Sequence, residues 1–227
     1  MDVLKKIWNF IWNDNSVWSW LVNIVLAFLL IKFVVYPLLG LALGTNYPIV
    51  AVVSGSMEHT AVHPCLDKDN FGYCTRTDKS IYEICGKTMT TKQPSDFDTY
   101  WDICGYWYEK NMNISKREFS EYPFHNGFKK GDLMILTRAK EDKLRIGDII
   151  VFKSSRPDPI IHRVVKISNN GYYSFQTKGD HNPGSINNNI INETNITKEK
   201  LLGKAVIRIP YLGWVKIGFV ELLNLIF

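Results

Sequence analysis

The sequence of 227 residues lacks any long run of charges of one sign, although its formal net charge is +5. Its 27 lysine and arginine residues are scattered along the chain, and it contains no recognisable nucleic-acid-binding motif. A scattered positive charge is more typical of a protein at a membrane or an acidic cell surface than of one that binds nucleic acid. We therefore predict no nucleic-acid partner.

Closely spaced cysteine pairs are also missing. The four cysteines are Cys65, Cys74, Cys85 and Cys104, and no C-x-x-C pair occurs among them. Zinc sites usually need ligand pairs at short spacing, so we predict no metal. An even number of cysteines in one segment favours disulfides in an oxidising compartment, and the three pairings that four cysteines allow all stay open. Four buried free thiols in a cytosolic domain are the alternative.

Three N-x-S/T sequences are candidate glycosylation sites, and they begin at Asn113, Asn192 and Asn195. Glycosylation of such sites places a segment on the surface of a secreted or extracytoplasmic protein. Single matches are common by chance, so these sites support the disulfide interpretation only as a group.

The one long apolar run lies near the N-terminus. Residues 1–16 combine two lysines with tryptophan, phenylalanine and isoleucine, a pattern typical of a segment that lies in the headgroup region. Residues 17–44 are almost wholly apolar and, at about 1.5 Å per residue, exceed the roughly 30 Å hydrocarbon layer. Because the apolar part of a cleaved signal peptide is only about 7–15 residues long, we predict a transmembrane anchor, ended or kinked at Pro37, with a cytoplasmic N-terminus.

The rest of the chain is predicted to be a β-rich extracytoplasmic domain over residues 45–209. Residues 58–128 hold all four cysteines, show little helical or strand periodicity, and are expected to be an insertion shaped by disulfides. Short apolar strands then alternate with Gly-Asp turns. The expected strands are Leu133–Thr137, Ile149–Lys153, Ile160–Ile167, Tyr172–Thr177 and Ala205–Ile209. Residues 210–227 are apolar but contain charges, so they are expected to form either a second transmembrane helix or an interfacial one.

A candidate nucleophile follows the anchor in the stretch Val50–Met57, which reads V-A-V-V-S-G-S-M. Its β-branched run suits a strand, and the Ser-Gly-Ser sequence then turns the chain sharply, so that a hydroxyl can be presented at the strand end. A plain surface turn is the alternative. A serine hydroxyl needs a base to remove its proton. The candidates among the five histidines are His162, in an amphipathic strand, and His181; we expect His59, His63 and His125 to lie at the surface.

Several fragments resemble type I signal peptidases of the branch found in archaea and the endoplasmic reticulum, in which a histidine replaces the bacterial lysine base. They occur in the family's order after an N-terminal anchor, and they leave the insertion unexplained. The fragments are Val53–Glu58, Lys130–Leu133, Arg145–Phe152, Ile161–Val164, Thr177–Asp180, and Gly203–Ala205 with Ile209–Gly213.

The resemblance implies a mainly β catalytic domain of the signal peptidase and LexA-like kind, with an N-terminal transmembrane helix and an apolar C-terminal helix. It implies that Ser56 is the nucleophile and His162 the general base. The oxyanion would be bound by the backbone N–H of Ser56 and the hydroxyl of Ser54.

The acid of the site departs from the family's pattern. Members of this branch tend to carry a second aspartate about six residues after the Gly-Asp pair, but here that place falls near Ile186, and no carboxylate follows until Glu193. We therefore expect Asp180 to orient His162, as triad logic requires. A structural role for Asp180 in its turn is the alternative.

The function implied by the resemblance is the cleavage of signal peptides from exported preproteins at the outer membrane face, without metal or organic cofactor. The expected partners are preproteins, the lipid bilayer of the cell membrane and the protein translocation machinery. Two alternatives stay open: an inactive or substrate-restricted peptidase-like subunit, and a membrane-anchored β-domain that binds cell-surface components.

Overall fold

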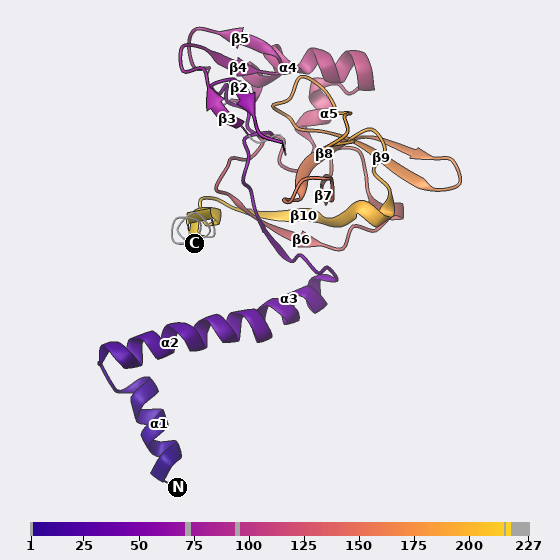
Figure 1. Ribbon diagram of the computed structural model, residues 1–227. Coiled ribbons are helices and arrows are strands. Elements are labelled where there is room, and N and C mark those ends of the chain that lie inside the picture. The colour runs from indigo at the N-terminus through magenta and orange to yellow at the C-terminus, as the bar shows by residue number, and fades with distance from the viewer. Residues whose placement is uncertain (1, 71–73, 94–95, 216, 219–227) are drawn as a thin grey trace. The chain divides into compact units, whose positions relative to one another are not determined.

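A computed structural model describes residues 2–70, 74–93, 96–215 and 217–218. The chain divides into two compact units, Met1–Pro48 and Ile49–Phe227, and each is described by itself (Figure 1). The predicted C-terminal membrane segment, residues 210–227, lies mostly outside the described residues.

The first unit is helical. Its elements are α1 (Asp2–Trp12), α2 (Val17–Leu30), the π-helical turn η1 (Ile31–Val35) and α3 (Tyr36–Leu43). The last three form one helix, Val17–Leu43, which by length and composition can cross a membrane and contains an 18-residue stretch with a mean hydropathy of 2.5. Ser16 caps its start and Gly44, in the left-handed region, ends it.

The helix continues past Pro37, so of the two outcomes expected at this proline, an end or a kink, the end is excluded. Pro37 lies in the first turn of α3, directly after η1. Proline has no N–H to donate and crowds the preceding turn, and a π-helical turn is one of the local adjustments that let a helix continue past it.

Two side chains of α2 bind the end of α1. The Ser19 hydroxyl donates to the carbonyl of Phe10 at 2.5 Å, and the Asn23 amide donates to the carbonyl of Ile11 at 2.9 Å. The last carbonyls of a helix have no partner within the helix. These two bonds therefore supply partners for the end of α1.

The second unit contains a six-stranded antiparallel sheet with the order β1-β6-β10-β7-β8-β9. Its strands are β1 (Ile49–Ala51), β6 (Leu133–Thr137), β7 (Ile149–Phe152), β8 (Ile160–Asn169), β9 (Tyr173–Lys178) and β10 (Leu201–Ile209). The five strands expected after the insertion are all present, so the mainly β fold is confirmed. Alternate side chains of β6 and β7 and Ile161 of β8 pack with Met57 and Phe128 in one buried cluster.

Two of the Gly-Asp turns are structural. Asp132 accepts from the backbone N–H of Lys129 and pairs with Arg208 of β10 at 2.7 Å. Asp148 accepts from the N–H of Arg145 and pairs with Lys204 of β10, also at 2.7 Å. Each carboxylate thus closes its own turn and attaches the turn to the central strand β10.

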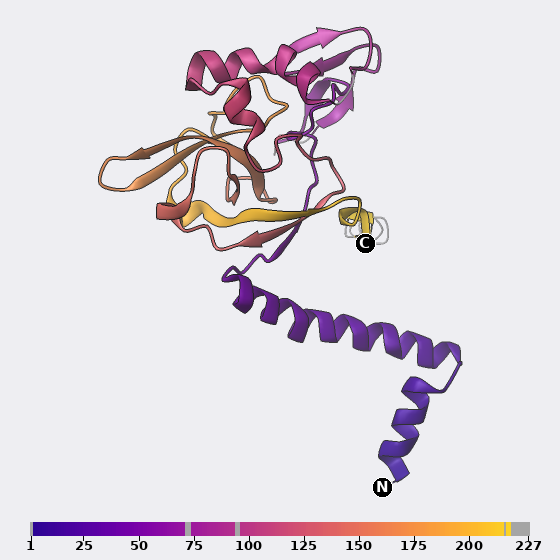
Figure 2. The ribbon, with the colours of Figure 1, turned by 180° about the vertical axis from the view of Figure 1, so that it is seen from behind.

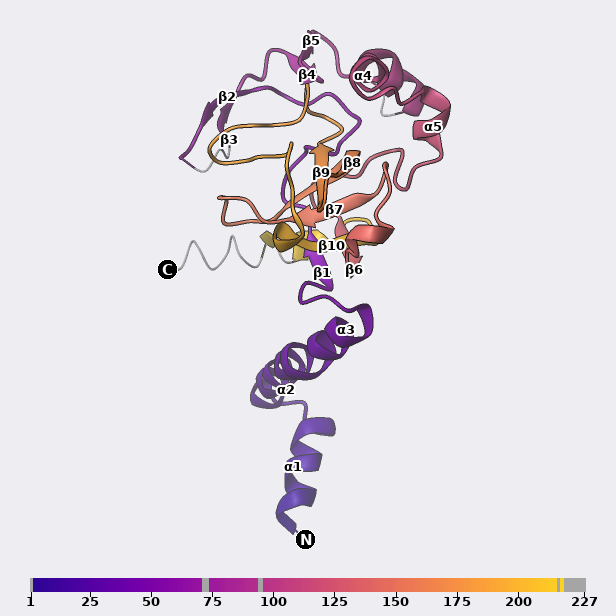
Figure 3. The same ribbon diagram turned by 90° about the vertical axis from the view of Figure 1, so that its right-hand side faces the viewer.

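The insertion is more regular than the sequence indicated. It contains the hairpins β2 (Cys65–Lys68) with β3 (Cys74–Thr77) and β4 (Tyr82–Ile84) with β5 (Lys87–Met89), and the helices α4 (Phe97–Met112) and α5 (Lys116–Ser120). Figures 1 and 2 show these elements gathered on one side of the sheet, and Figure 3 shows the β2–β3 hairpin and the two helices on either side of β4–β5.

Both disulfides of the insertion are formed. Cys65 is bonded to Cys74 across the β2–β3 hairpin, and Cys85, which follows β4, is bonded to Cys104 of α4. The second bond lies within an aromatic cluster that includes Tyr100, Tyr108 and Phe119. The insertion therefore has its own core, which packs against Val165 of β8.

Candidate functional site

Strand β1 leads into the turn that carries the candidate nucleophile. After β1, the N–H of Val52 donates to the carbonyl of Asp132, and the N–H of Glu58 closes the turn on the carbonyl of Gly55 at 3.0 Å. Met57 is fully buried in the sheet core, while Ser56 beside it is half-buried. The buried methionine anchors the turn and leaves the Ser56 hydroxyl accessible.

His162, on strand β8, contacts this hydroxyl. Its Nε2 lies 2.8 Å from Ser56 Oγ, although 106 positions separate the two residues. The residue is only 3 % exposed, and its strand is paired on both sides, with β7 and β9. A strand paired on both sides is a rigid support, so the ring is held close to the Ser56 hydroxyl.

The carboxylate behind the ring belongs to Glu193. One of its oxygens, Oε1, is hydrogen-bonded to His162 Nδ1 and accepts from the Thr177 hydroxyl at 2.9 Å. The other oxygen, Oε2, accepts from the N–H of Ile186 at 2.6 Å. Both oxygens of Glu193 accept hydrogen bonds, so His162 Nδ1, which faces Oε1, is the donor. The hydrogen-bond network therefore assigns the proton of the His162 ring to Nδ1. Nε2 is then free to accept the Ser56 proton.

The structure places the expected acid, Asp180, elsewhere. Its oxygens pair with Arg163 at 2.7 and 2.9 Å and with His59 Nε2 at 3.0 Å, and Oδ1 also accepts from the Tyr108 hydroxyl. Burial alone would raise the pKa of this carboxyl, but the charge of Arg163 and the bonds from His59 and Arg163 outweigh burial and hold the pKa well below its usual range.

The reason for this correction is the alternation of a β-strand. His162 and Arg163 are neighbours on β8, so their side chains point to opposite faces of the sheet. A carboxylate that binds the Arg163 guanidinium on one face cannot also lie behind the His162 ring on the other. Sequence reasoning missed Glu193, and the available signal was that no other carboxylate occurs between Asp180 and Glu199.

One further expectation changes in the same region, and the rival candidate base lies there too. His59, expected at the surface, is buried, and its ring stacks on Tyr100 with centroids 3.5 Å apart. Burial lowers its pKa, against the opposing effect of Asp180. His181, the other candidate base, has its backbone N–H bonded to the carbonyl of Ser56 and its Nδ1 3.2 Å from the carbonyl of Glu58. His181 therefore contacts the backbone of the nucleophile turn, while His162 contacts its hydroxyl.

The lack of a side chain at Gly179 leaves room for the contact between Ser56 and His162. A Cβ at this position would lie 2.7 Å from both His162 Nε2 and the carbonyl oxygen of Ser56. Real side chains essentially never approach so closely. The glycine of this Gly-Asp pair is therefore required by the close approach of the backbone to the site.

A groove of about 600 Å³ opens beside Ser56 and His162. Strand β1 at the edge of the sheet contributes one part of its lining, and the polar loop after β9 contributes another. The lining is mostly apolar and includes Val50, Val53, Ile161, Ile186 and Ile190, with Ser54 beside the nucleophile. The Ser54 hydroxyl lies 3.2 Å from Ser56 Oγ.

The three candidate glycosylation sites, Asn113, Asn192 and Asn195, have exposed side chains. Asn113 ends α4 in the left-handed region, and the Asn192 side chain caps the turn that follows Glu193. Their exposure is compatible with modification, which stays a prediction.

No family model matches the chain. Among curated proteins, it is 40% identical over 94 residues to the signal peptidase complex catalytic subunit SEC11C of Homo sapiens and to that of Canis lupus familiaris, a match that covers 40% of this chain and 49% of each relative. It is 32% identical over 94 residues to the catalytic subunit SEC11 of Colletotrichum graminicola, covering 40% of this chain and 55% of that protein.

The chain thus spans about half the length of the curated relatives it matches. Their identity of 32% to 40% extends over a segment longer than any single motif. These relatives confirm the resemblance that the motifs indicate: the chain is similar to the catalytic subunits of signal peptidase complexes, and through them to type I signal peptidases of the branch found in archaea and the endoplasmic reticulum.

Proposed function

We propose that this protein is a membrane-anchored serine endopeptidase that removes signal peptides from exported preproteins. The observation that carries the proposal is the contact of Ser56 Oγ with His162 Nε2 at 2.8 Å, backed by Glu193 and open to a groove. A nucleophile, its base and a group that orients the base are the parts that nucleophilic catalysis by serine requires.

In the proposed reaction, His162 Nε2 accepts the proton of Ser56 while Oγ attacks the carbonyl carbon of the scissile peptide bond. The backbone N–H of Ser56 and the hydroxyl of Ser54 stabilise the negative charge that develops on the carbonyl oxygen. The imidazolium then protonates the leaving amine, and an activated water hydrolyses the acyl-enzyme. No metal or organic cofactor takes part.

Glu193 would act on the histidine and not on the substrate. It accepts from Nδ1 and so selects the tautomer whose Nε2 has a free lone pair. It also stabilises the imidazolium once the ring has taken the proton. The presence of Glu193 weighs against an inactive subunit, because that alternative depends on the absence of a second acid.

The groove supports an extended peptide as the substrate. β1 is an edge strand, so the substrate backbone can pair with it by strand addition. Apolar side chains such as Val53, Ile161 and Ile186 then line shallow pockets that suit small residues one and three positions before the cut.

We infer that the helix Val17–Leu43 anchors the enzyme in a membrane, with the N-terminus in the cytoplasm and the β-domain outside. The exposed apolar side chains near Ser56, such as Val53, are then close to lipid. Signal peptides have an apolar core of their own, so an enzyme at the membrane surface meets the substrate where its cleavage segment leaves the bilayer. The translocation machinery is the expected source of these preproteins.

The test is cleavage of a model preprotein by the full chain in detergent or vesicles. We expect Ser56→Ala and His162→Ala each to lower kcat by at least about 1,000-fold, because the oxyanion site and binding alone leave little catalysis. Ser80→Ala, in an exposed turn, and His125→Ala are the matched controls and should cleave at the native rate. If Ser56→Ala cleaves as well as the native chain, the proposal is wrong.

A further inference from the structure

Residues 178–182, which we call the support loop, lie beneath both catalytic side chains. The N–H of His181 donates to the carbonyl of Ser56 at 2.9 Å, and the N–H of Asp180 approaches Met57 Sδ at 3.4 Å. Gly179 packs so closely that a Cβ would lie 2.7 Å from His162 Nε2. Any displacement of the support loop would therefore shift the backbone of Ser56 and open the space beside the His162 ring.

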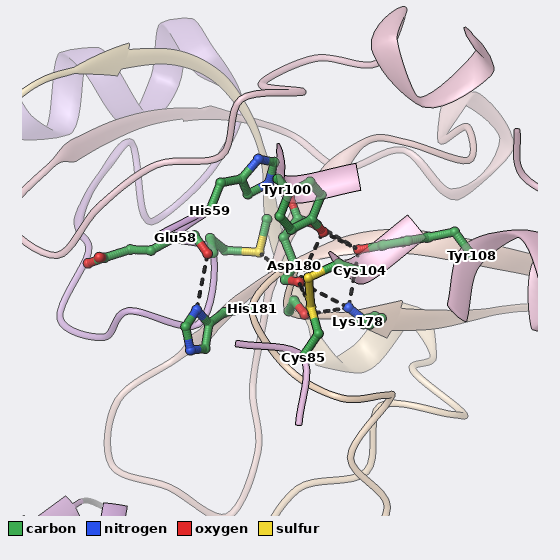
Figure 4. Close-up of a disulfide and its surroundings, with 11 residues drawn as sticks. Glu58, His59, Cys85, Tyr100, Cys104, Tyr108, Lys178, Asp180 and His181 are labelled. Carbon is green, nitrogen blue, oxygen red and sulfur yellow. Dashed lines mark hydrogen bonds and ion pairs between the residues drawn. A yellow bond between two sulfur atoms is a disulfide. The ribbon is translucent and has the colours of Figure 1, made fainter. Parts of the chain in front are cut away.

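The other side of the support loop is held by the insertion (Figure 4). The Tyr100 hydroxyl donates to the carbonyl of Asp180 at 3.0 Å, and the Tyr108 hydroxyl donates to Asp180 Oδ1 at 3.1 Å. From the end of β4, the N–H of Cys85 donates to the carbonyl of His181 at 2.8 Å. All three donors come from a segment that the family resemblance leaves unexplained.

These contacts are arranged by one face of α4. Tyr100, Cys104 and Tyr108 are spaced four residues apart, so they lie along the same side of the helix, and all three are buried. The disulfide joins the middle one of the three to Cys85. The disulfide therefore connects the two elements, α4 and the end of β4, that hold the support loop.

Lys178 completes this arrangement from within the loop. Its Nζ donates to the carbonyls of Gly179 and Asp180, both at 3.1 Å, and to the Tyr108 hydroxyl at 3.3 Å. The ammonium lies 4.6 Å from the centre of the Tyr108 ring. A buried lysine needs such partners because burial without them is costly. Its contacts hold the loop backbone against α4.

We propose that this face of α4 is a positioning element for the peptidase reaction: Tyr100 and Tyr108, supported by the Cys85–Cys104 disulfide, hold the support loop so that Ser56 and His162 stay in contact. The inference rests on the proposed function. Neither tyrosine contacts the catalytic pair, so both are positioning residues that act through the loop. Both tyrosines belong to the insertion, so the insertion helps to position the catalytic residues.

The test compares Tyr100→Phe/Tyr108→Phe with Tyr106→Phe. Each substitution removes only a hydroxyl, and Tyr106 is on the same helix but 64% exposed. We expect the double variant to lose roughly tenfold in kcat with an unchanged KM, because misplacement of catalytic groups by a fraction of an ångström is costly while the groove itself is intact. Tyr106→Phe should keep the native kcat.

Amide hydrogen exchange supplies a readout that does not depend on activity. The double variant should exchange roughly tenfold faster at residues 178–182, with native protection in β7 and β8. Unchanged exchange in the support loop would overturn the positioning proposal, whatever the activity. An altered KM with native kcat would also overturn it, because the tyrosines would then serve substrate binding.

The disulfide provides a second variant. Cys85→Ser/Cys104→Ser should show the same faster exchange in the support loop and lower kcat, whereas Cys65→Ser/Cys74→Ser should leave exchange there unchanged. If both disulfide variants give the same loop exchange, the assigned role of Cys85–Cys104 is wrong. If native and Ser56→Ala chains cleave alike, the peptidase proposal fails, while the exchange data still decide what holds the loop.

Discussion

Two buried carboxylates near the catalytic site differ in what they stabilise. Glu193 is bonded to His162, and Asp180 is bonded to Arg163 and His59. The bond between Glu193 and His162 influences which ring nitrogen of His162 carries the proton. The interaction of Asp180 with Arg163 neutralises a guanidinium that is itself fully buried. The same kind of side chain therefore serves the proposed catalysis in one case and folding in the other.

Substitutions that remove one charge from each carboxylate should separate these roles. We expect Glu193→Gln to lower kcat roughly 1,000-fold with a small effect on the melting temperature, because the amide can donate to Nδ1 and select the wrong tautomer. Asp180→Asn should instead destabilise the fold by about 3 kcal/mol, because it leaves Arg163 buried without its counter-charge. Thermal unfolding and kcat, measured on both variants, check the pair of predictions. Similar effects from the two variants would contradict them.

The low pKa of His181 should make the free energy of unfolding depend on pH. Burial is the main cause that lowers the pKa of His181 from 6.5 to about 4. Between these values the unfolded chain binds a proton that the folded chain excludes, so the free energy of unfolding should fall as the pH falls through this range. His181→Gln should make this decline shallower, measured by chemical denaturation at about pH 7 and about pH 5. His125→Gln is the control, and an equally steep decline in His181→Gln would contradict the prediction.

At the scale of elements, strands were predictable and the long helix of the insertion was not. The strands β6 to β10 alternate apolar and polar residues or form short apolar runs between turns, and this pattern is local. Helix α4 buries Tyr100, Cys104 and Tyr108 on one face, but it also carries aromatic residues away from that face, such as the exposed Tyr106. Its helical period was therefore masked.

The two disulfides should stabilise the insertion more than the sheet. Cross-links that close loops of this size remove about 3 kcal/mol of chain entropy from the unfolded state. Reduction should therefore raise the rate of limited proteolysis within residues 65–104 roughly tenfold, while β6 to β10 stay resistant. Peptide mapping by mass spectrometry with and without reductant checks this. Equal cleavage patterns in both samples would show that the bridges do not support the insertion.

At the scale of the whole molecule, all three residues of the proposed catalytic site belong to the unit Ile49–Phe227, and the candidate anchor belongs to Met1–Pro48. The helix Val17–Leu43 exposes leucine, valine and phenylalanine over its length, as a helix surrounded by lipid would. The proposed catalytic residues and the candidate anchor helix therefore lie in different units of the chain.

Charges placed in the anchor should release the protein from membranes. An arginine at the centre of a transmembrane helix costs about 3 kcal/mol, so Leu26→Arg/Leu29→Arg should shift most of the chain into the supernatant after carbonate extraction. Leu66→Arg, at an exposed position of the β2–β3 hairpin, is the control and should stay in the membrane fraction. Retention of the doubly substituted chain would mean that another segment suffices for attachment.

Local sequence determined the long apolar helix, the strands and the Ser-Gly-Ser turn, because length, periodicity and turn chemistry act over a few residues. The choice of His162 over His181 as the partner of Ser56 came from the family resemblance. Only the tertiary structure decided which carboxylate lies behind His162. The identity of this carboxylate depends on the face of the sheet to which β8 directs each side chain. It also depends on the loop after β9, which brings Glu193 to the face that carries His162. The disulfide pairing and the contact of α4 with the support loop were decided in the same way, since both join segments whose distance in space no local pattern records.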